Sequence, residues 1–320
     1  MNIVAVIGIL VTLVTAIPVL VQLRRQPRGL FVLFFAEMWE RFSYYGMRGL
    51  LIFYLTQHFL HDDKFANGIY GAYTALVYVL PVIGGFLADH YLGTRKAVAF
   101  GALLLVAGHT TMAIEGPPAT QVLTYQAAEY DFQVDGRGPS RKVSLKVGDA
   151  AYAFGATPDG GLEIKDLPAG AALPAILPKG SFELSVKDRD PFFEGIFYFA
   201  LSLIIMGVGF LKPNISSLVG QLYPQADPRR DSGFTLFYYG INLGSFWAGI
   251  VCGWLGQTVG WWAGFGLAGI GMAVGYVVFV LGKSHLEGHG EPPHPERLAK
   301  PLFGPVTQEW LLYAAAIAGL

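Results

Sequence analysis

The chain has 320 residues, of which 53% are hydrophobic and only 14% are charged. Soluble domains carry about 25% charged residues, so this composition argues against a soluble protein and favours a membrane protein. The formal net charge of -1 argues against an electrostatic nucleic-acid partner. The single cysteine, Cys252, excludes an intrachain disulfide.

Apolar runs long enough to cross a bilayer predict the helices of the protein, because a spanning helix needs about 20 largely apolar residues. In chain order, these runs are 3–21, 30–60, 69–88 and 97–114 before a polar gap, then 195–222, 232–259 and 261–282, with a shorter apolar stretch at 310–320. The pattern predicts an all-α polytopic membrane protein with seven spans and the start of another helix.

The first run, within residues 1–25, has no basic residue before it and no A-x-A-like cleavage site, so we interpret it as an uncleaved helix rather than a secretory signal. The basic residues of the loops on one side are Arg24, Arg25, Arg28, Arg95, Lys96, Arg229, Arg230, Lys283, Arg297 and Lys300. By the positive-inside rule, we expect this side to face the cytoplasm. The N-terminus and the polar gap would then be extracytoplasmic.

The polar gap, residues 115–192, predicts a small β-rich domain, which we call the insert. Apolar and polar residues alternate over 130–134 and 143–147, as in half-buried strands. Turn signals stand at 135–136, 159–161 and 179–180. The insert could serve as a lid or a partner-docking module, or it could be a tolerated insertion without a part in the chemistry.

Five charged residues lie well inside the apolar runs: Glu37, Glu40, Arg41, Arg48 and Lys212. A charge at the centre of a spanning helix costs about 2.5 to 3.5 kcal/mol on insertion scales, so charges kept there are functional candidates. The sequence lacks a Ser/His/Asp set, a Cys/His cluster and a phosphate-binding glycine loop. We therefore expect no enzymatic activity, metal or cofactor.

Helical geometry gathers the charges of the second run on one face. At about 100° per residue, the polar and aromatic residues fall within an arc of roughly 140°. These residues are Glu37, Glu40, Arg41, Tyr44, Tyr45 and Arg48. Glu37 and Arg41 stand at i,i+4 and are expected to pair, while Glu40 is placed to reach a partner on another helix. A static ion-pair network that only holds helices together is the alternative interpretation.

Lys212 precedes Pro213 in the middle of a long apolar run. Beside Glu37 or Glu40, the lysine could keep its proton, and proton uptake by the carboxylate would weaken the pair. The pattern thus indicates a proton switch. Asn242 offers a donor and an acceptor within an apolar run, either for a ligand or as a hydrogen bond between helices.

Four segments resemble the proton-dependent oligopeptide transporter family of the major facilitator superfamily. Residues 37–46, EMWERFSYYG, are similar to its E-x-x-E-R-F-x-Y-Y-G motif, and residues 237–245, FYYGINLGS, to its F-Y-x-x-I-N-x-G signature. Residues 209–214, GFLKPN, are similar to its lysine-bearing helix. Residues 84–96, from GGFLAD to GTRK, resemble the gating loop of the superfamily.

The resemblance implies the N-terminal six-helix bundle of a major facilitator fold, as in the N-terminal portion of a bacterial peptide transporter. Residues 28–114 would supply its first three helices and residues 193–284 the other three. Residues 1–25 would be an extra helix, 115–192 the insert, and 285–320 a cytoplasmic linker with the start of the next helix. A C-terminal six-helix bundle is expected beyond residue 320.

The resemblance also implies roles for individual residues. Proton coupling would fall to Glu37, Glu40, Arg41 and Lys212, and gating to Asp89 and Arg95. Substrate binding would fall to Arg41, Tyr44, Tyr45, Arg48, Tyr78, Lys212 and Asn242. Within these sets, Arg41 and Lys212 would engage the peptide carboxylate and Asn242 the peptide backbone.

The expected function is proton-coupled symport of di- and tripeptides across the cytoplasmic membrane by alternating access. Protons would be the coupling ion, and the peptide and the lipid bilayer the other partners. One alternative is transport of another small anionic substrate within the same superfamily. The other is a receptor that does not transport and that uses the insert as its binding module.

Overall fold

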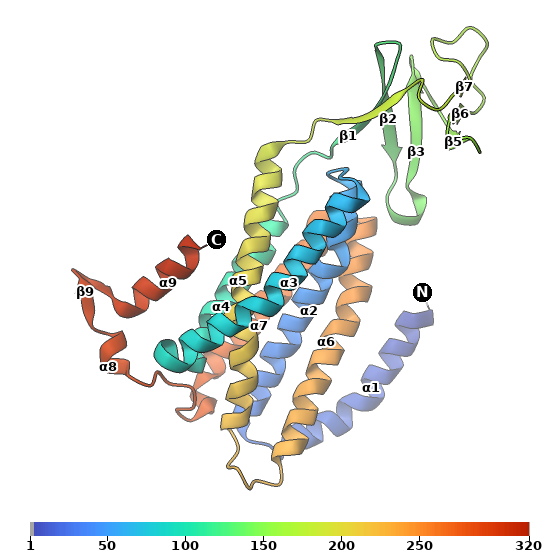
Figure 1. The fold of residues 1–320 in the computed structure, drawn as a ribbon. Coiled ribbons are helices and arrows are strands. Elements are labelled where there is room, and N and C mark those ends of the chain that lie inside the picture. The colour runs from blue at the N-terminus through green and yellow to red at the C-terminus, as the bar shows by residue number, and fades with distance from the viewer. Residues whose placement is uncertain (1–2, 320) are drawn as a thin grey trace.

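The computed structural model describes residues 3–319 and consists of a long helical bundle with a β-rich insert at one end (Figure 1). The long helices, in chain order, are α1 Ile3–Leu23, α2 Arg28–Gln57, α3 Asp63–Leu87, α4 Gly93–Met112, α5 Pro191–Gln221, α6 Arg230–Thr258 and α7 Trp261–Gly282. Each predicted apolar run forms a helix. The all-helical membrane architecture predicted from composition is confirmed, with the insert as its β-rich exception.

Four stretches within residues 3–319 are long and apolar enough to cross a membrane: Ile3–Leu23, Asp63–Met112, Pro191–Gln221 and Trp261–Leu286. The second stretch contains both α3 and α4, which the π-helical turn Ala88–Leu92 joins. Two further predicted spans, α2 and α6, are not among these stretches. Both carry more polar residues, and α2 carries the charged cluster Glu37, Glu40 and Arg41.

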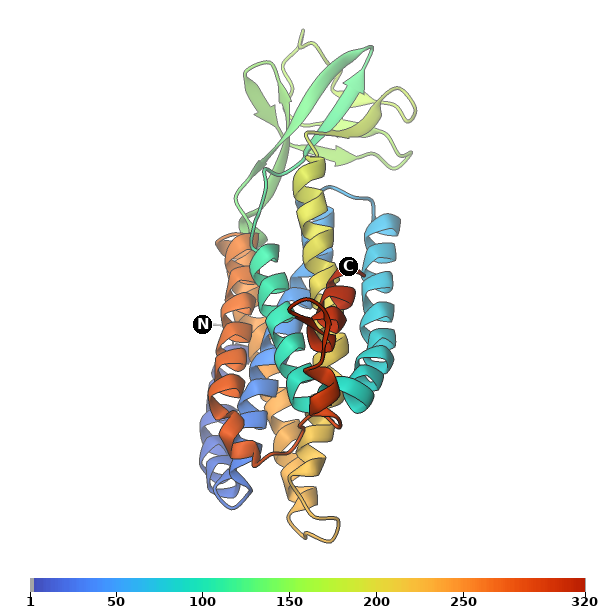
Figure 2. The same ribbon diagram turned by 90° about the vertical axis from the view of Figure 1, so that its left-hand side faces the viewer.

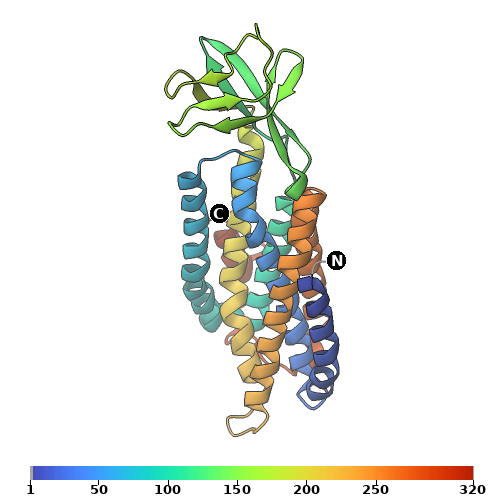
Figure 3. The same cartoon turned by 90° about the vertical axis from the view of Figure 1, so that its right-hand side faces the viewer.

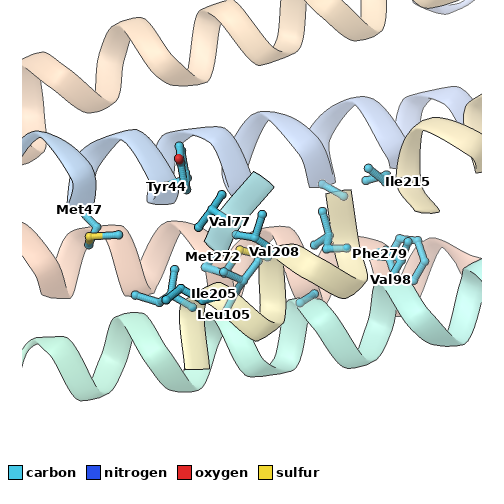
Figure 4. Close-up of a cluster of buried hydrophobic side chains, with 14 of the residues drawn as sticks. Tyr44, Met47, Val77, Val98, Leu105, Ile205, Val208, Ile215, Met272 and Phe279 are labelled. Carbon is cyan, nitrogen blue, oxygen red and sulfur yellow. The ribbon is translucent and has the colours of Figure 1, made fainter. Parts of the chain in front are cut away.

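Glycines let the helices of the bundle approach closely. A Cβ at Gly84 of α3 would overlap the backbone of Gly209 of α5, and one at Gly101 of α4 would lie 2.6 Å from the carbonyl oxygen of Gly207. Lipid is as apolar as the side chains, so close packing rather than water exclusion holds membrane helices together. In the resulting core, labelled side chains of α2, α3, α4, α5 and α7 meet (Figure 4).

Helix α1 lies beside α6 at the edge of the bundle (Figure 3) and leaves most of its surface exposed. Two side-chain contacts hold it there: Trp247 Nε1 donates to Thr12 Oγ1 at 3.1 Å, and Thr15 Oγ1 lies 2.5 Å from Tyr239 Oη. In an apolar surrounding, such hydrogen bonds orient one helix on another. The predicted extra helix is therefore an attached part of the bundle.

The insert contains two small antiparallel sheets. Its strands are β1 Thr120–Tyr125, β2 Ala128–Asp135, β3 Lys142–Val147, β4 Ala150–Tyr152, β5 Phe154–Ala156, β6 Leu162–Ile164, β7 Ile176–Leu177 and β8 Glu183–Lys187. One sheet has the order β4-β3-β2-β1-β8 and the other β5-β6-β7. The predicted strands at 130–134 and 143–147 are confirmed as β2 and β3, which pair through Phe132 opposite Leu145.

Hydrogen bonds to backbone carbonyl groups attach the insert to the turn that follows α2. The guanidinium of Arg189 donates to the carbonyl oxygens of Phe59 and Leu60 at 2.8 and 3.1 Å. The backbone N–H of Ala119 donates to the carbonyl oxygen of His58 at 2.9 Å. Both connections of the insert to the bundle are thus fixed next to the same turn, so the insert is docked rather than loosely tethered.

The segment that follows α7 runs back against α4 and comprises α8 Pro295–Leu298, β9 Pro301–Phe303, β10 Val306–Thr307 and α9 Gln308–Ala318. Lys96 Nζ of α4 lies 2.5 Å from Glu309 Oε2, and the rings of Phe100 and Tyr313 stack with centroids 4.4 Å apart. Figure 2 shows α9 lying across the outside of α4 and α5. The apolar stretch predicted at 310–320 lies in this helix up to Ala318; residue 320 lies outside the described residues.

Candidate functional site

The predicted binding and coupling residues lie on α2, α3, α5 and α6, and the predicted gating residues Asp89 and Arg95 lie in the π-helical turn and on α4. α3 and α7 lie at opposite edges of the bundle (Figure 2), and α2 packs against both α6 and α7. α2 therefore carries predicted site residues and also packs in the core of the bundle. Its cluster of charges decides what the site can do chemically.

Arg41 holds two carboxylates of its own helix. Its Nε lies 2.8 Å from Glu37 Oε1 and 2.7 Å from Glu40 Oε2, and all three side chains are buried. The predicted i,i+4 pair of Glu37 and Arg41 therefore forms. Glu40 contacts Arg41 as well, whereas the sequence suggested a partner on another helix.

The hydrogen bonding of this cluster is incomplete. Glu37 Oε2 and both carboxylate oxygens of Glu40 are buried without a hydrogen-bond donor in the described part of the chain. The short distance between Glu40 and Arg41 is thus an ion contact without hydrogen-bond alignment. Two carboxylates facing one guanidinium leave one negative charge uncompensated, and a buried uncompensated charge is costly. A proton on either carboxylate would neutralise the cluster.

Lys212 lies on α5, which packs against α3. No carboxylate oxygen within residues 3–319 lies within 4.0 Å of its ammonium group. Its Nζ lies 4.5 Å from the ring centroid of Tyr78, in cation–π geometry. The structure therefore brings Lys212 and Tyr78 together and leaves the lysine without an ion pair to residues 3–319.

Tyrosines surround a second cation, Arg48. Its Nε donates to Tyr70 Oη at 2.7 Å, and its guanidinium lies 5.4 Å from the centroid of the same ring. Tyr44 lies edge-on to Tyr45 with centroids 5.1 Å apart and stacks on Tyr73 at 6.3 Å. α2 thus presents the guanidinium of Arg48 against the ring of Tyr70 on α3.

The remaining predicted residues lie at the edges of this face. Asn242 is exposed on α6, and its amide nitrogen donates to the carbonyl oxygen of Tyr238 one turn earlier at 2.8 Å. Its side-chain oxygen accepts no hydrogen bond from residues 3–319, so it remains able to accept one from a ligand. Asp89 is exposed in the π-helical turn, and Arg95 forms an ion pair with Glu291 of the segment after α7.

Gly93 explains how the turn at the predicted gate is built. Its φ of +74° is in the left-handed region, which favours glycine. A Cβ there would also lie 2.6 Å from the backbone of Gly290 and of Pro292. The backbone N–H of Arg95 donates to the carbonyl oxygen of Gly290 at 2.9 Å. The segment after α7 therefore closes directly over this turn.

Sequence reasoning missed three residues of the face: Tyr70, Tyr73 and Asn214. Tyr70 and Tyr73 stand at i,i+3 on α3, a spacing that places them on one helix face, and this signal could have found them. Asn214 is buried and donates from its amide nitrogen to Gly84 at 3.3 Å and to Phe210 at 2.7 Å. It secures the helix beyond Lys212, and no sequence pattern distinguishes that role.

Solved structures with the same fold are peptide transporters and their relatives. A peptide transporter POT in complex with sulfate is 33% identical, with a TM-score of 0.58, over 92% of this chain and 44% of that chain. A POT family transporter in complex with 5-aminolevulinic acid is 29% identical, with a TM-score of 0.59, over 92% and 45%. These likenesses agree with the major facilitator bundle expected from the sequence.

Curated sequences give the same result. An uncharacterized transporter, YclF, of Bacillus subtilis is 34% identical over 86% of this chain and 41% of its own length. A di-/tripeptide transporter of Lactococcus lactis subsp. cremoris is 32% identical over 84% and 41%. The chain thus spans less than half the length of these relatives. A family model described as POT family matches residues 95–298. The chain belongs to the POT family, whose members are membrane transporters rather than enzymes.

Proposed function

We propose that the protein carries out proton-coupled symport of di- and tripeptides by alternating access, with this chain supplying the N-terminal bundle. The observation that carries the proposal is the buried cluster in which Glu37 and Glu40 share the single guanidinium of Arg41. The di-/tripeptide transporter among the relatives supports the choice of substrate. A second bundle of the whole protein would complete the peptide site.

The cluster supports a coupling mechanism. While both carboxylates are ionised, they hold Arg41 within α2. A proton taken up by Glu40 or Glu37 removes one of the two attractions, so the guanidinium becomes free to turn toward the carboxylate of a bound peptide. Protonation and substrate binding would then favour each other, which is the requirement for symport.

The other cations would position the peptide. Lys212 and Arg48 lie against tyrosine rings rather than carboxylates, so each can bind a peptide carboxylate without first breaking an ion pair. Tyr45 and Tyr78 are exposed and offer aromatic surface to varied side chains, whereas Tyr44 is buried and supports Tyr45. Asn242 can accept a hydrogen bond from the peptide backbone. The cations and the amide thus recognise the carboxylate and the backbone, which all short peptides have.

The test uses the full-length protein in vesicles with an imposed proton gradient and a labelled dipeptide. Glu40→Gln keeps the shape of the side chain but removes the titrating group, so we expect gradient-driven accumulation to be lost while peptide exchange without a gradient persists. Glu129→Gln, the same change at an exposed position of the insert, is the matched control. Intact accumulation in Glu40→Gln would remove Glu40 from the coupling path.

Two alternatives have distinct outcomes. Accumulation of a small anion in place of dipeptides would indicate a transporter of the same superfamily with another substrate, which Lys212 and Arg48 would bind. The second alternative is tested by deleting residues 116–190 of the insert. Unchanged peptide uptake after this deletion would contradict a receptor whose function resides in the insert. We expect this deletion to leave transport in place.

We further propose that the protein lies in the cytoplasmic membrane with its N-terminus and insert outside. The basic loops that follow α1, α5 and α7 lie at the end of the bundle opposite the insert (Figure 1). This distribution is the one that the positive-inside rule favours. A cysteine introduced at exposed Lys142 should react in intact cells with a reagent that does not cross membranes, and one at Arg25 should not.

A further inference from the structure

A cavity lies between the insert and the end of the bundle. It has a volume of about 310 Å³, and its walls come from the end of α2, the turn between α6 and α7, and the hairpin of β2 and β3. Small-molecule sites in proteins begin at about 300 Å³, so the cavity has the size of a site for a small ligand. We call it the insert pocket. It is separate from the charged cluster on α2.

The charges of the insert pocket are unbalanced. Glu115 Oε1 lies 3.6 Å from the guanidinium of Arg137, and Glu115 Oε2 accepts a hydrogen bond from the backbone of Trp262 at 2.8 Å. Arg141 also lines the pocket; its backbone N–H donates to Gly138, but its guanidinium has no ion pair or hydrogen bond to any residue between 3 and 319. One guanidinium is therefore left over, and the pocket favours an anionic group.

Neutral polar groups of the pocket also lack partners. Three glutamine side chains, Gln57, Gln121 and Gln257, line it without a hydrogen bond to the described part of the chain. His58 lines it too; only 2% of this residue is exposed, and its Nε2 has no partner. Burial and the charge of Arg137 lower the pKa of His58 to about 4, so the imidazole is neutral and can both donate and accept.

This combination defines a class of ligand. The spare guanidinium of Arg141 matches a carboxylate, with which arginine forms paired hydrogen bonds. The three amide side chains match the N–H and C=O groups of peptide bonds. We propose that the insert and the bundle together form a second binding site for a short peptide with a free carboxylate, which Arg141 binds. The choice of a peptide over other small carboxylates rests on the proposed function.

Glu115 would act on this site indirectly. It lies between His58 Nδ1, at 3.9 Å, and the guanidinium of Arg137, while the backbone of Trp262 fixes its other oxygen. It is thus a positioning residue that joins the insert to the first turn of α7. A bound ligand would contact both the insert and the bundle, so an occupied pocket would hold the insert more firmly on the bundle.

The test measures dipeptide binding to the full-length protein in lipid nanodiscs by calorimetry. For the unaltered protein, Ala-Ala should bind in two phases, one for the central site and one for the insert pocket. Arg141→Gln should weaken one phase by roughly tenfold or more, the effect of losing a charged hydrogen bond. Lys142→Gln removes the same charge at the neighbouring exposed position, outside the pocket, and should leave both phases unchanged.

Two further ligands identify the chemistry. Ala-Ala with an amidated C-terminus should lose the phase that depends on Arg141, and acetate should not reproduce it. Identical isotherms for Arg141→Gln and the unaltered protein would overturn the proposal. Acetate binding as tightly as Ala-Ala in that phase would also overturn it, in favour of a simple anion site.

Folding and transport controls keep the outcomes distinct. Amide hydrogen exchange of the insert in Arg141→Gln should match that of Lys142→Gln, and Arg141→Lys should recover part of the binding. If acid-driven uptake persists but no phase depends on Arg141, the insert pocket proposal fails alone. If a phase depends on Arg141 but peptides are not transported, the proposed function fails and the pocket stands.

Discussion

The bundle and the insert use buried residues in opposite ways. In the bundle, apolar residues surround the helices on all sides, and the informative residues are the few buried charges, Glu37, Glu40 and Arg41. In the insert, most residues are exposed or half-buried, and the informative residues are the few buried apolar ones, among them Leu123 and Leu145. The exceptional residues form the candidate site in the first region and the core in the second.

The comparison implies different costs of mutation. Removing a charge from the bundle leaves its partners buried and unpaired in an apolar surrounding, which affects function and stability together. Removing an apolar residue from the insert reduces a core that is already close to the lower limit for an independent domain. The first change should stop transport, and the second should unfold one region while the other continues to work.

The largest effect is expected for Arg41→Ala. It leaves Glu37 and Glu40 buried without a cation, and breaking a buried ion pair in this way costs about 3 to 5 kcal/mol. We expect loss of transport and a clear decrease in the melting temperature of the full-length protein in detergent. Arg24→Ala, the same change at an exposed position, should do neither. Normal transport by Arg41→Ala would remove the cluster from the mechanism.

Leu145→Ala should have the next largest effect and should act on the insert alone. Leu145 is fully buried in the core of the insert, and such truncations cost about 2 to 5 kcal/mol. Limited proteolysis should cut the insert of this variant rapidly, while peptide uptake by the bundle continues. Val134→Ala, at a residue that is 50% exposed, is the control. Loss of uptake together with proteolysis of the insert would show that the two regions are not independent.

Acidification should loosen the contact between the two regions. Burial and Arg137 lower the pKa of His58 to about 4, whereas a solvated histidine titrates near 6.5. When the insert is detached from the bundle, His58 is solvated and binds more protons between these two pH values. The free energy that favours docking of the insert therefore decreases as the pH falls through that window, by at most about 2 kcal/mol at pH 5. Above pH 6.5 it should not change.

Amide hydrogen exchange of residues 115–119 at several pH values measures this effect. The only charged groups that face His58 are Glu115, 3.9 Å from Nδ1, and Arg137, considering the part of the chain that the structure describes. His58→Gln should flatten the profile and leave only the smaller slope of His61, whose pKa burial also lowers. An unchanged slope in His58→Gln would assign the pH dependence to another group.

The smallest effect is expected outside both regions, at the segment after α7. Glu309→Gln removes the ion pair with Lys96, and partly exposed pairs of this kind contribute about 0.2 to 1 kcal/mol. Exchange of the α9 amides should rise by no more than about fivefold, because Phe100 and Tyr313 still stack. Glu287→Gln, at an exposed residue without an ion pair in residues 3–319, is the control. Full release of α9 would show that the ion pair, not the stacking, holds it.

Much of the bundle could be predicted from the sequence because the signals are local. The length of each apolar run fixed its helix, and helical periodicity placed Glu37 next to Arg41. The contact of Glu40 with Arg41, instead of a cation on another helix, depends on side-chain rotamers that periodicity does not specify. Strands β2 and β3 were found by their alternation, whereas β5, β6 and β7 are too short to show any.

The sequence by itself determined that this is a membrane protein, where its helices lie, and to which family it belongs. It placed five charges in the apolar runs, of which the structure buries Glu37, Glu40 and Arg41 and leaves Arg48 and Lys212 half-buried. Only the tertiary structure decided that Lys212 meets Tyr78, that the segment after α7 closes over Gly93, and that Arg141 faces a cavity on the bundle without a partner. The reason is physical. Apolar length and helical periodicity act between neighbours along the chain, whereas these contacts join distant segments and depend on how the helices and sheets pack.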